Sequence, residues 1–236
     1  IRAYSYEGEE YGTRPLSDQQ ERALGEVREA FDEGKTVLLH GVTGSGKTRV
    51  YIELIREALQ RDEQVLYLLP EIALTAQLVN RLRRVFGDEV GIYHSRVNDN
   101  ERIELWNAAL KGKPVVMGAR SGLFLPFRKL KLIIVDEEHD SSYKQQDPAP
   151  RYNARDTAIY LAHLCQARVL LGTATPSLES YYNARSGKYR LVEMPERFGD
   201  AQLPEMQLVD MRDEYKKRKM KSHFTSVLIE EMTRAL

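Results

Sequence analysis

The chain has 236 residues, 42% of them hydrophobic, which is enough for a buried core in one large domain or two small ones. Its 35 basic and 35 acidic residues cancel, so composition excludes attraction of nucleic acid by an overall positive field. No apolar run approaches the roughly 20 residues that a membrane-spanning helix needs, and the single cysteine, Cys165, excludes an intrachain disulfide. We therefore expect a globular cytoplasmic protein without a membrane partner, in which Cys165 packs as a small hydrophobe.

The chain alternates between short β-branched runs and helical patterns after a polar lead-in at 1–15. Strands are expected at 36–39, 64–69, 90–93, 114–117, 132–135 and 168–171, and helices at 50–59, 73–86 and 101–110. This alternation predicts an α/β fold with a mostly parallel sheet and helices on both faces. Ligands of such sheets bind at the carboxyl ends of the strands.

The first chemical motif lies between the strand expected at 36–39 and the helix expected at 50–59. Residues 41–48 read Gly-Val-Thr-Gly-Ser-Gly-Lys-Thr, the pattern of a phosphate-binding loop. Its glycines let backbone N–H groups converge on the β-phosphate, Lys47 reaches the β and γ oxygens, and the Thr48 hydroxyl holds magnesium. The sequence thus predicts a site for ATP and Mg²⁺ whose contacts are Gly41, Thr43, Gly44, Ser45, Gly46, Lys47 and Thr48.

The second motif, Asp-Glu-Glu-His at 136–139, follows a strand that is expected to be buried. Asp136 would hold the magnesium, and Glu137 would orient and deprotonate the attacking water, so Lys47, Asp136 and Glu137 are the expected catalytic residues. His139 has two interpretations: it relays the nucleotide state to the next motif, or it satisfies a local turn.

The phosphate loop and Asp-Glu-x-His together resemble superfamily 2 helicases of the DEAH-like type, which are built on RecA-like P-loop lobes. Segments 69–75, 118–121 and 172–176 match further helicase motifs in the expected order. The resemblance implies DNA contacts for Arg120 and Ser121, and coupling roles for His139, Thr173 and Thr175. It also implies that Gln20 reads the adenine, although a glutamine on a surface helix is the plainer alternative.

Longer matches are similar to the family of bacterial replication-restart helicases, primosomal protein N′ or PriA. They span 16–211 and include 41–51, 69–75, 93–95, 118–127, 136–145 and 172–180. The departures are Ala119, where that family has threonine, and the absence of its zinc-binding cysteines. The resemblance implies a 3′ to 5′ ATP-dependent DNA helicase that acts in replication restart and primosome assembly at stalled forks. Its partners would be single-stranded or forked DNA, primosome and replication-restart proteins, and single-strand binding protein.

The segment 140–156 mixes aromatic, cationic and proline residues, a composition typical of proteins that bind single strands. Bases would stack on Tyr143 or Tyr152, while Lys144, Arg151 and Arg155 offset phosphate charge. The alternative is a surface loop held by its own aromatic residues, with Arg155 paired to Asp156 or another nearby acid.

Superfamily 2 motors complete their ATP site with arginines from a second RecA-like lobe, and no such lobe fits after Met211. We therefore expect 16–211 to be lobe 1 and 212–236 to be a linker and the start of lobe 2, so that the chain binds ATP but hydrolyses it poorly. Two other functions stay open. One is a RecG-like or restriction-type translocase, which should lack the 140–155 loop in this form; the other is a nucleotide-gated module that binds a primosome partner.

Overall fold

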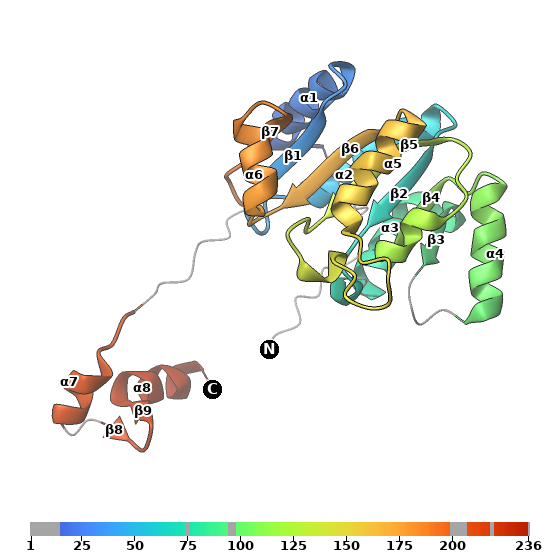
Figure 1. Ribbon diagram of the computed structural model, residues 1–236. Helices are drawn as coiled ribbons and strands as arrows, with labels where there is room; N and C mark the ends of the chain where they lie inside the picture. Colours follow the sequence, from blue (N-terminus) through green and yellow to red (C-terminus); the bar gives the residue numbers. More distant parts are fainter. Residues whose placement is uncertain (1–14, 74–75, 94–97, 199–206, 218–219, 236) are drawn as a thin grey trace. The chain divides into compact units, whose positions relative to one another are not determined.

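The computed structural model describes residues 15–73, 76–93, 98–198, 207–217 and 220–235 (Figure 1). The predicted lead-in at 1–15, apart from Pro15, lies outside the described residues, as do parts of the quoted motifs at 74–75 and 94–95. The chain forms two compact units, 1–199 and 200–236. The predicted end of lobe 1, residue 211, lies inside the second unit. The assignment of 16–211 to lobe 1 and of 212–236 to a linker and the start of lobe 2 stays a prediction.

Seven parallel strands form one sheet in the first unit, in the order β3-β4-β2-β5-β6-β1-β7 (Figure 1). The strands are β1 (Thr36–Gly41), β2 (Gln64–Leu68), β3 (Val90–Tyr93), β4 (Val115–Gly118), β5 (Leu130–Asp136), β6 (Arg168–Thr173) and β7 (Tyr189–Met194). The predicted α/β class and the six predicted strands are confirmed. The edge strand β7 was not predicted, because Arg190 and Glu193 interrupt its apolar pattern.

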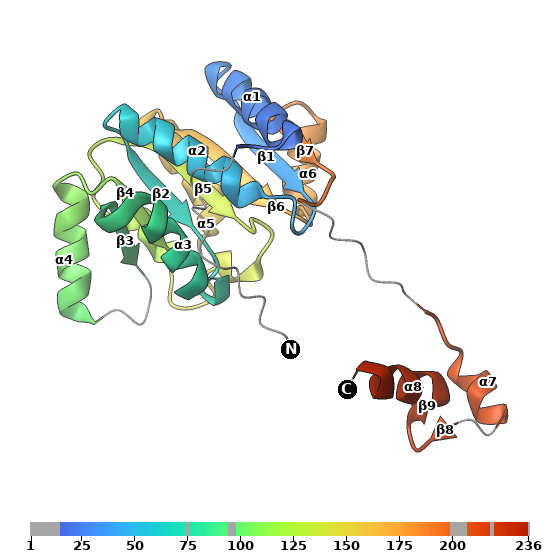
Figure 2. The ribbon, with the colours of Figure 1, turned by 180° about the vertical axis from the view of Figure 1, so that it is seen from behind.

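Helices cover both faces of the sheet, as predicted (Figures 1 and 2). One face carries α1 (Asp18–Asp32), α2 (Lys47–Gln60) and α3 (Ala76–Phe86), and the other carries α5 (Ala154–Cys165) and α6 (Leu178–Arg185). The helix α4 (Asp99–Leu110) contacts β3 at the sheet edge. The described residues of this unit also include short 3₁₀ helices, which are η1 (Glu71–Ala73), η2 (Gly87–Glu89), η3 (Arg120–Phe124) and η4 (Ser141–Tyr143).

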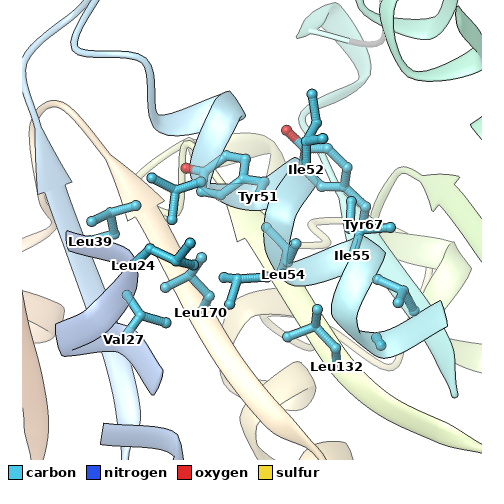
Figure 3. Packing of buried hydrophobic residues seen from close by; sticks show 14 of the residues in the cluster. Leu24, Val27, Leu39, Tyr51, Ile52, Leu54, Ile55, Tyr67, Leu132 and Leu170 are labelled. Carbon is cyan, nitrogen blue, oxygen red and sulfur yellow. The ribbon is translucent and has the colours of Figure 1, made fainter. Parts of the chain in front are cut away.

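The core follows from the two-residue period of the strands. Successive side chains of a strand point to opposite faces, so Leu39 packs with α1 and α2 whereas Leu38 packs with α5. The α1–α2 side is built from large aliphatic residues and two buried tyrosines (Figure 3). Because both faces are covered, the strands are nearly continuous apolar runs, which is why the sequence revealed them.

The second unit contains α7 (Met211–Lys216), the two-stranded pair β8 (Met220–Lys221) and β9 (Phe224–Thr225), and α8 (Ser226–Ala235). An amphipathic pattern that begins at about Thr225 predicts a helix, and α8 confirms it. The Ser226 hydroxyl donates to the Glu214 carboxylate over 3.2 Å, which ties α8 to α7. Throughout the described residues, every helix is too short or too polar to cross a lipid bilayer.

The strand order positions the site. Because β6 lies between β5 and β1, the carboxyl ends of these three strands bring Asp136, Thr173 and Gly41 to one edge of the sheet. Asp136 is in register with Gly172 on β6, and Thr173 is in register with His40 on β1. Residues that are far apart in the sequence thereby become neighbours where a ligand of a parallel sheet is expected.

The interior strand β6 allows a prediction about the stability of the fold. Replacing Leu170, which is fully buried against α2, with alanine should lower the free energy of unfolding by about 2 to 5 kcal/mol, because it leaves a cavity. Leu178→Ala on α6, where the side chain is 81% exposed, should change it by no more than about 0.5 kcal/mol. Urea unfolding followed by circular dichroism measures both, and equal losses would contradict the packing described.

Candidate functional site

The loop between β1 and α2 has the backbone of an anion-binding site. Gly44 and Gly46 adopt left-handed conformations, with φ of 83° and 87°, that other residues rarely adopt. Gly46 is the N-cap of α2 and has no side chain to cap the helix, so no cap side chain competes with a ligand for the first N–H groups. A helix N-terminus of this kind favours phosphate.

The side chains of this loop also fit a phosphate group. Lys47 Nζ donates to the Gly41 carbonyl over 2.6 Å, and burial lowers the pKa of Lys47 while Asp136 and Glu137 oppose that shift. The Ser45 hydroxyl is buried and has no hydrogen-bond partner in the described part of the chain. An unsatisfied buried hydroxyl costs about 1 to 3 kcal/mol, a cost that a phosphate oxygen would remove.

The two residues predicted to hold magnesium are Thr48, half-buried in the first turn of α2, and Asp136 at the end of β5. Among the described residues no group of three or more His, Cys, Asp or Glu side chains forms a metal site. This set fits Mg²⁺, which takes few protein ligands and completes its shell with phosphate oxygens and water.

The carboxylate of Asp136 is held by tyrosine hydroxyls. Tyr51 donates to its Oδ1 over 2.9 Å and Tyr67 donates to its Oδ2 over 3.0 Å. Burial, and then the neighbouring charge of Glu137, raise the pKa of Asp136. These contacts could not be predicted from the sequence, since Tyr51 and Tyr67 lie in ordinary apolar patterns.

The next residue, Glu137, has a left-handed backbone with φ of 49°, which is rare for a residue other than glycine. Its carbonyl accepts a hydrogen bond from the Asp140 N–H over 2.8 Å, closing a tight turn. Its carboxylate is 41% exposed, beside Lys47 and 3.7 Å from His139. Such conformations gather at functional sites, where the surrounding structure compensates their strain.

The third acid, Glu138, is fully buried and satisfied by four donors. Its carboxylate accepts from Arg155 Nη1 over 3.1 Å, from the Ser177 N–H and hydroxyl, and from the Ser180 hydroxyl. Sequence reasoning gave Glu138 no role. One feature of the sequence could have indicated a role: the motif at 136–139 has three acidic residues, whereas the expected chemistry uses only two of them.

The structure places Arg155 inside the fold, which differs from the predicted DNA contact. Its guanidinium, 10% exposed, pairs with Glu138 and with Asp156 at 2.8 Å, which is the alternative pairing that the sequence left open. In this arrangement the guanidinium has almost no surface to offer a phosphate.

The predicted coupling residues lie together. His139 Nδ1 is 2.8 Å from the Thr173 hydroxyl, and its Nε2 is 3.3 Å from the Thr175 hydroxyl. The Thr175 N–H donates to the Thr173 hydroxyl over 3.1 Å. The end of β6 is therefore connected to the acidic turn after β5, and the role assigned to this contact stays a prediction.

The predicted DNA contacts divide into exposed and buried residues. Ser121, Lys144 and Arg151 are exposed, and Tyr152 is half-buried. Tyr143 is only 1% exposed, so the structure places it in the core and not on a surface where bases stack.

Segments 118–124 and 140–153 meet through Arg120. Its Nη1 donates to the Ser142 carbonyl over 2.9 Å. Tyr152 packs edge to face on Phe124, with ring centroids 5.2 Å apart. Phe124 is 54% exposed, and sequence reasoning had not assigned it a role.

Hydrogen bonds close the 144–153 loop on itself. Lys144 Nζ donates to the Arg151 carbonyl over 2.6 Å, and Lys144 bridges to Asn153 in antiparallel fashion. The Gln145 side chain donates to the carbonyls of Pro148 and Pro150. The loop is thus an ordered projection with cationic and aromatic residues on it.

The predicted adenine contact, Gln20, is 3% exposed and caps α1. Its side-chain oxygen accepts from the Ser17 N–H, and a Cβ on Gly46 would lie 2.2 Å from its Nε2, so it packs directly under the phosphate loop. Its neighbour Gln19 forms a reciprocal pair with the main chain of Glu196. The Phe198 N–H donates to the Gly44 carbonyl, so the segment after β7 also braces the loop.

Comparison with known proteins places this site in context. The DEAD/DEAH box helicase family profile matches residues 17–184. The replication restart protein PriA of Bacillus subtilis strain 168 is 43% identical over 92% of this chain and 27% of its own length. The chain spans about 30% of the curated relatives it matches.

Two solved helicase structures share the fold. RecG bound to a three-way DNA junction is 22% identical, with a TM-score of 0.61 over 87% of this chain and 27% of that chain. The helicase MrfA bound to DNA and AMPPNP is 20% identical, with a TM-score of 0.51 over 77% of this chain and 27% of that chain. At these identities the likeness establishes the architecture alone.

The buried Glu138 yields a prediction. Glu138→Ala should lower the free energy of unfolding by about 3 to 5 kcal/mol, because it leaves Arg155 buried without this partner. Glu104→Ala, at an exposed position on α4, is the matched control and should cost less than about 0.5 kcal/mol. If denaturant unfolding gives the two variants equal stability, the buried pair does not hold α5 and the acidic turn together.

Proposed function

The chain belongs to the DEAD/DEAH box helicase family, and from that premise we propose that it is the ATP-binding motor lobe of a DNA helicase. The observation that carries the proposal is the meeting of the phosphate loop, Asp136 and Thr173 at the ends of three adjacent strands. A nucleotide bound there would touch the elements that also lead to the 140–153 loop.

In this proposal the chain's own residues divide the work of hydrolysis. The open N–H groups of the phosphate loop and Lys47 bind the β- and γ-phosphates, and Asp136 orients the metal's water shell. Magnesium, when bound, neutralises charge that develops on the phosphate oxygens. Glu137 would accept a proton from the attacking water while the water oxygen bonds to the γ-phosphorus and the bond from that phosphorus to the bridging oxygen breaks, which releases ADP and phosphate.

We propose that the acidic turn at 136–139 couples the nucleotide site to the segment after β6. His139 lies between Glu137, 3.7 Å away, and the hydroxyls of Thr173 and Thr175. A change at the γ-phosphate that moves Glu137 would therefore reach the segment after β6. Hydrogen-bond networks with two alternative arrangements are a general means of such coupling.

For the whole protein we propose a 3′ to 5′ ATP-dependent DNA helicase that acts in replication restart, in the cytoplasm. The 43% identity to the Bacillus subtilis replication restart protein supports this proposal. Single-stranded or forked DNA would be the substrate. Primosome proteins and single-strand binding protein would be its partners.

We propose further that this chain binds ATP·Mg²⁺ but hydrolyses it slowly by itself. The resemblance to superfamily 2 motors implies that a second lobe would supply an arginine to the transition state, and an arginine finger in GTPases is worth about 10³ to 10⁵ in turnover. Within the described residues, Lys47 is a cation that interacts electrostatically with Asp136 and Glu137, and it comes from this chain.

Two other functions compete with this proposal. A RecG-like or restriction-type translocase has the fold likeness to RecG in its favour. The far higher identity to replication restart proteins, and the presence of the ordered 140–153 loop, favour the restart helicase. A nucleotide-gated primosome-binding module would show partner capture that differs between ATP and ADP, without DNA-dependent turnover.

The nucleotide site is tested by two substitutions. Lys47→Ala should weaken binding of a fluorescent ADP with Mg²⁺ by about 10- to 100-fold, since charge-assisted hydrogen bonds to phosphate are lost. Glu137→Gln should keep the affinity within about threefold, because Glu137 acts on the water and not on the nucleotide. Lys111→Ala, at an exposed position after α4, is the control, and equal losses from Lys47→Ala and Glu137→Gln would overturn the roles.

The DNA face is tested at the Tyr152–Phe124 pair. Alanine at either position should weaken binding of a fluorescent single-stranded oligonucleotide by about 5- to 100-fold, because base stacking on an aromatic ring is lost. Tyr160→Ala on α5, where the side chain is 64% exposed, is the control. Fluorescence anisotropy at low salt measures all three, and unchanged binding in every variant would count against this surface.

A further inference from the structure

Three buried tyrosines converge on one aspartate. The hydroxyls of Tyr51 and Tyr67 donate to the two carboxylate oxygens of Asp136, and the hydroxyl of Tyr143 donates to its main-chain carbonyl over 2.6 Å. Each of the three tyrosines is no more than 1% exposed. They come from α2, which follows the phosphate loop, from β2, and from η4, which begins the 140–153 loop.

The packing around the rings shows that their placement is tightly constrained. Tyr51 and Tyr67 meet edge to face, with ring centroids 5.7 Å apart and planes at 76° (Figure 3). A Cβ on Gly172 would lie 1.8 Å from the Tyr51 hydroxyl oxygen, so only glycine at this point of β6 leaves room for that hydroxyl. An apolar side chain such as phenylalanine would fill the same space in the core without a buried polar atom. Packing alone therefore does not require a tyrosine at these positions, and the hydroxyls serve the hydrogen bonds to Asp136.

The hydrogen bonds fix how Asp136 can turn. Its Oδ1 accepts from Tyr51 and from the Glu137 N–H, while Oδ2 accepts from Tyr67. Two donors on opposite oxygens hold the plane of the carboxylate, and a carboxylate retains further lone pairs for other donors. Groups that orient a ligand in this way tune a metal site strongly.

We propose that Tyr51, Tyr67 and Tyr143 form a tyrosine clasp that positions Asp136 for magnesium and ties it to the 140–153 loop. The proposal deepens the nucleotide-site function and rests on it. The three tyrosines are positioning residues, since their hydroxyls bind Asp136 and would act through it. Tyr143 therefore has an internal role here in place of the base stacking that its sequence context predicted.

The loop side of the clasp passes through η4. Tyr143 lies between Ser142, whose carbonyl accepts from Arg120, and Lys144, which bridges to Asn153. A ligand that moves the Arg120 and Tyr152 surface would shift η4, and with it the hydroxyl that holds the Asp136 main chain. Coupling of this kind is reciprocal, so nucleotide binding must also change the stability of the loop.

The carboxylate side is tested with Tyr51→Phe, Tyr67→Phe and the double variant. We compare the affinity for a fluorescent ADP in Mg²⁺ with that in EDTA. The affinity for ADP in EDTA should stay within about twofold of that of the unmodified chain. The ratio of the affinity in Mg²⁺ to the affinity in EDTA, which we call the Mg²⁺-dependent gain, should fall by about tenfold or more in the double variant. Tyr189→Phe, a buried tyrosine on β7 away from Asp136, is the matched control and should keep the full gain.

The outcomes separate the clasp from the function on which it rests. If the unmodified chain binds no ADP, the nucleotide function fails and the clasp fails with it. If Mg²⁺ raises the affinity of the unmodified chain for ADP and raises that of the double variant as much, the clasp alone is overturned. If the double variant loses affinity equally in Mg²⁺ and EDTA, the hydroxyls serve the fold in general, which also overturns the positioning role.

The loop side is tested with Tyr143→Phe by hydrogen exchange of peptides that cover 140–153. In the unmodified chain, ADP with Mg²⁺ should slow exchange in these peptides by about threefold or more, and Tyr143→Phe should abolish that slowing while ADP still binds. No slowing in the unmodified chain, or the same slowing in the variant, contradicts the tie to the loop.

Discussion

The left-handed turn at Glu137 is the constraint on which the site depends. It lets four consecutive side chains enter four different environments directly after β5. Asp136 lies on buried tyrosine hydroxyls, Glu137 lies beside Lys47, Glu138 enters the core, and His139 reaches the end of β6. An extended strand would send alternate side chains to the same face and could not make this division.

Together these side chains contact α2, β2, α5, β6 and the start of α6, so the turn acts as a junction. Glu138 connects β5 to α5 through Arg155 and to the start of α6 through Ser177 and Ser180. Tyr143 connects the same turn to the 140–153 loop. The Glu138 carboxylate at this junction is buried and satisfied by four donors, and a buried network of this kind is rigid and costly to break.

The sequence predicted the sheet and the ligand-binding motifs because both depend on local patterns. Continuous apolar runs mark strands that are buried on both faces, and glycine spacing marks the phosphate loop. The pairing of Glu138 with Arg155 and the clasp on Asp136 depend on which residues the fold brings together, and no local pattern encodes that. Tyr143 illustrates best what a local pattern cannot predict. An aromatic residue among charged ones is typical of a surface, yet Tyr143 is buried.

We propose above that this chain binds ATP and needs a partner lobe to hydrolyse it in response to DNA. The most direct test is phosphate release from ATP, with and without single-stranded DNA, by this chain and by a chimera that carries it in place of the matching residues of the Bacillus subtilis relative. We expect slow phosphate release that does not respond to DNA from the chain alone, and DNA-stimulated release from the chimera. Brisk release by the chain alone would contradict it, because the lobe would then supply every catalytic group itself.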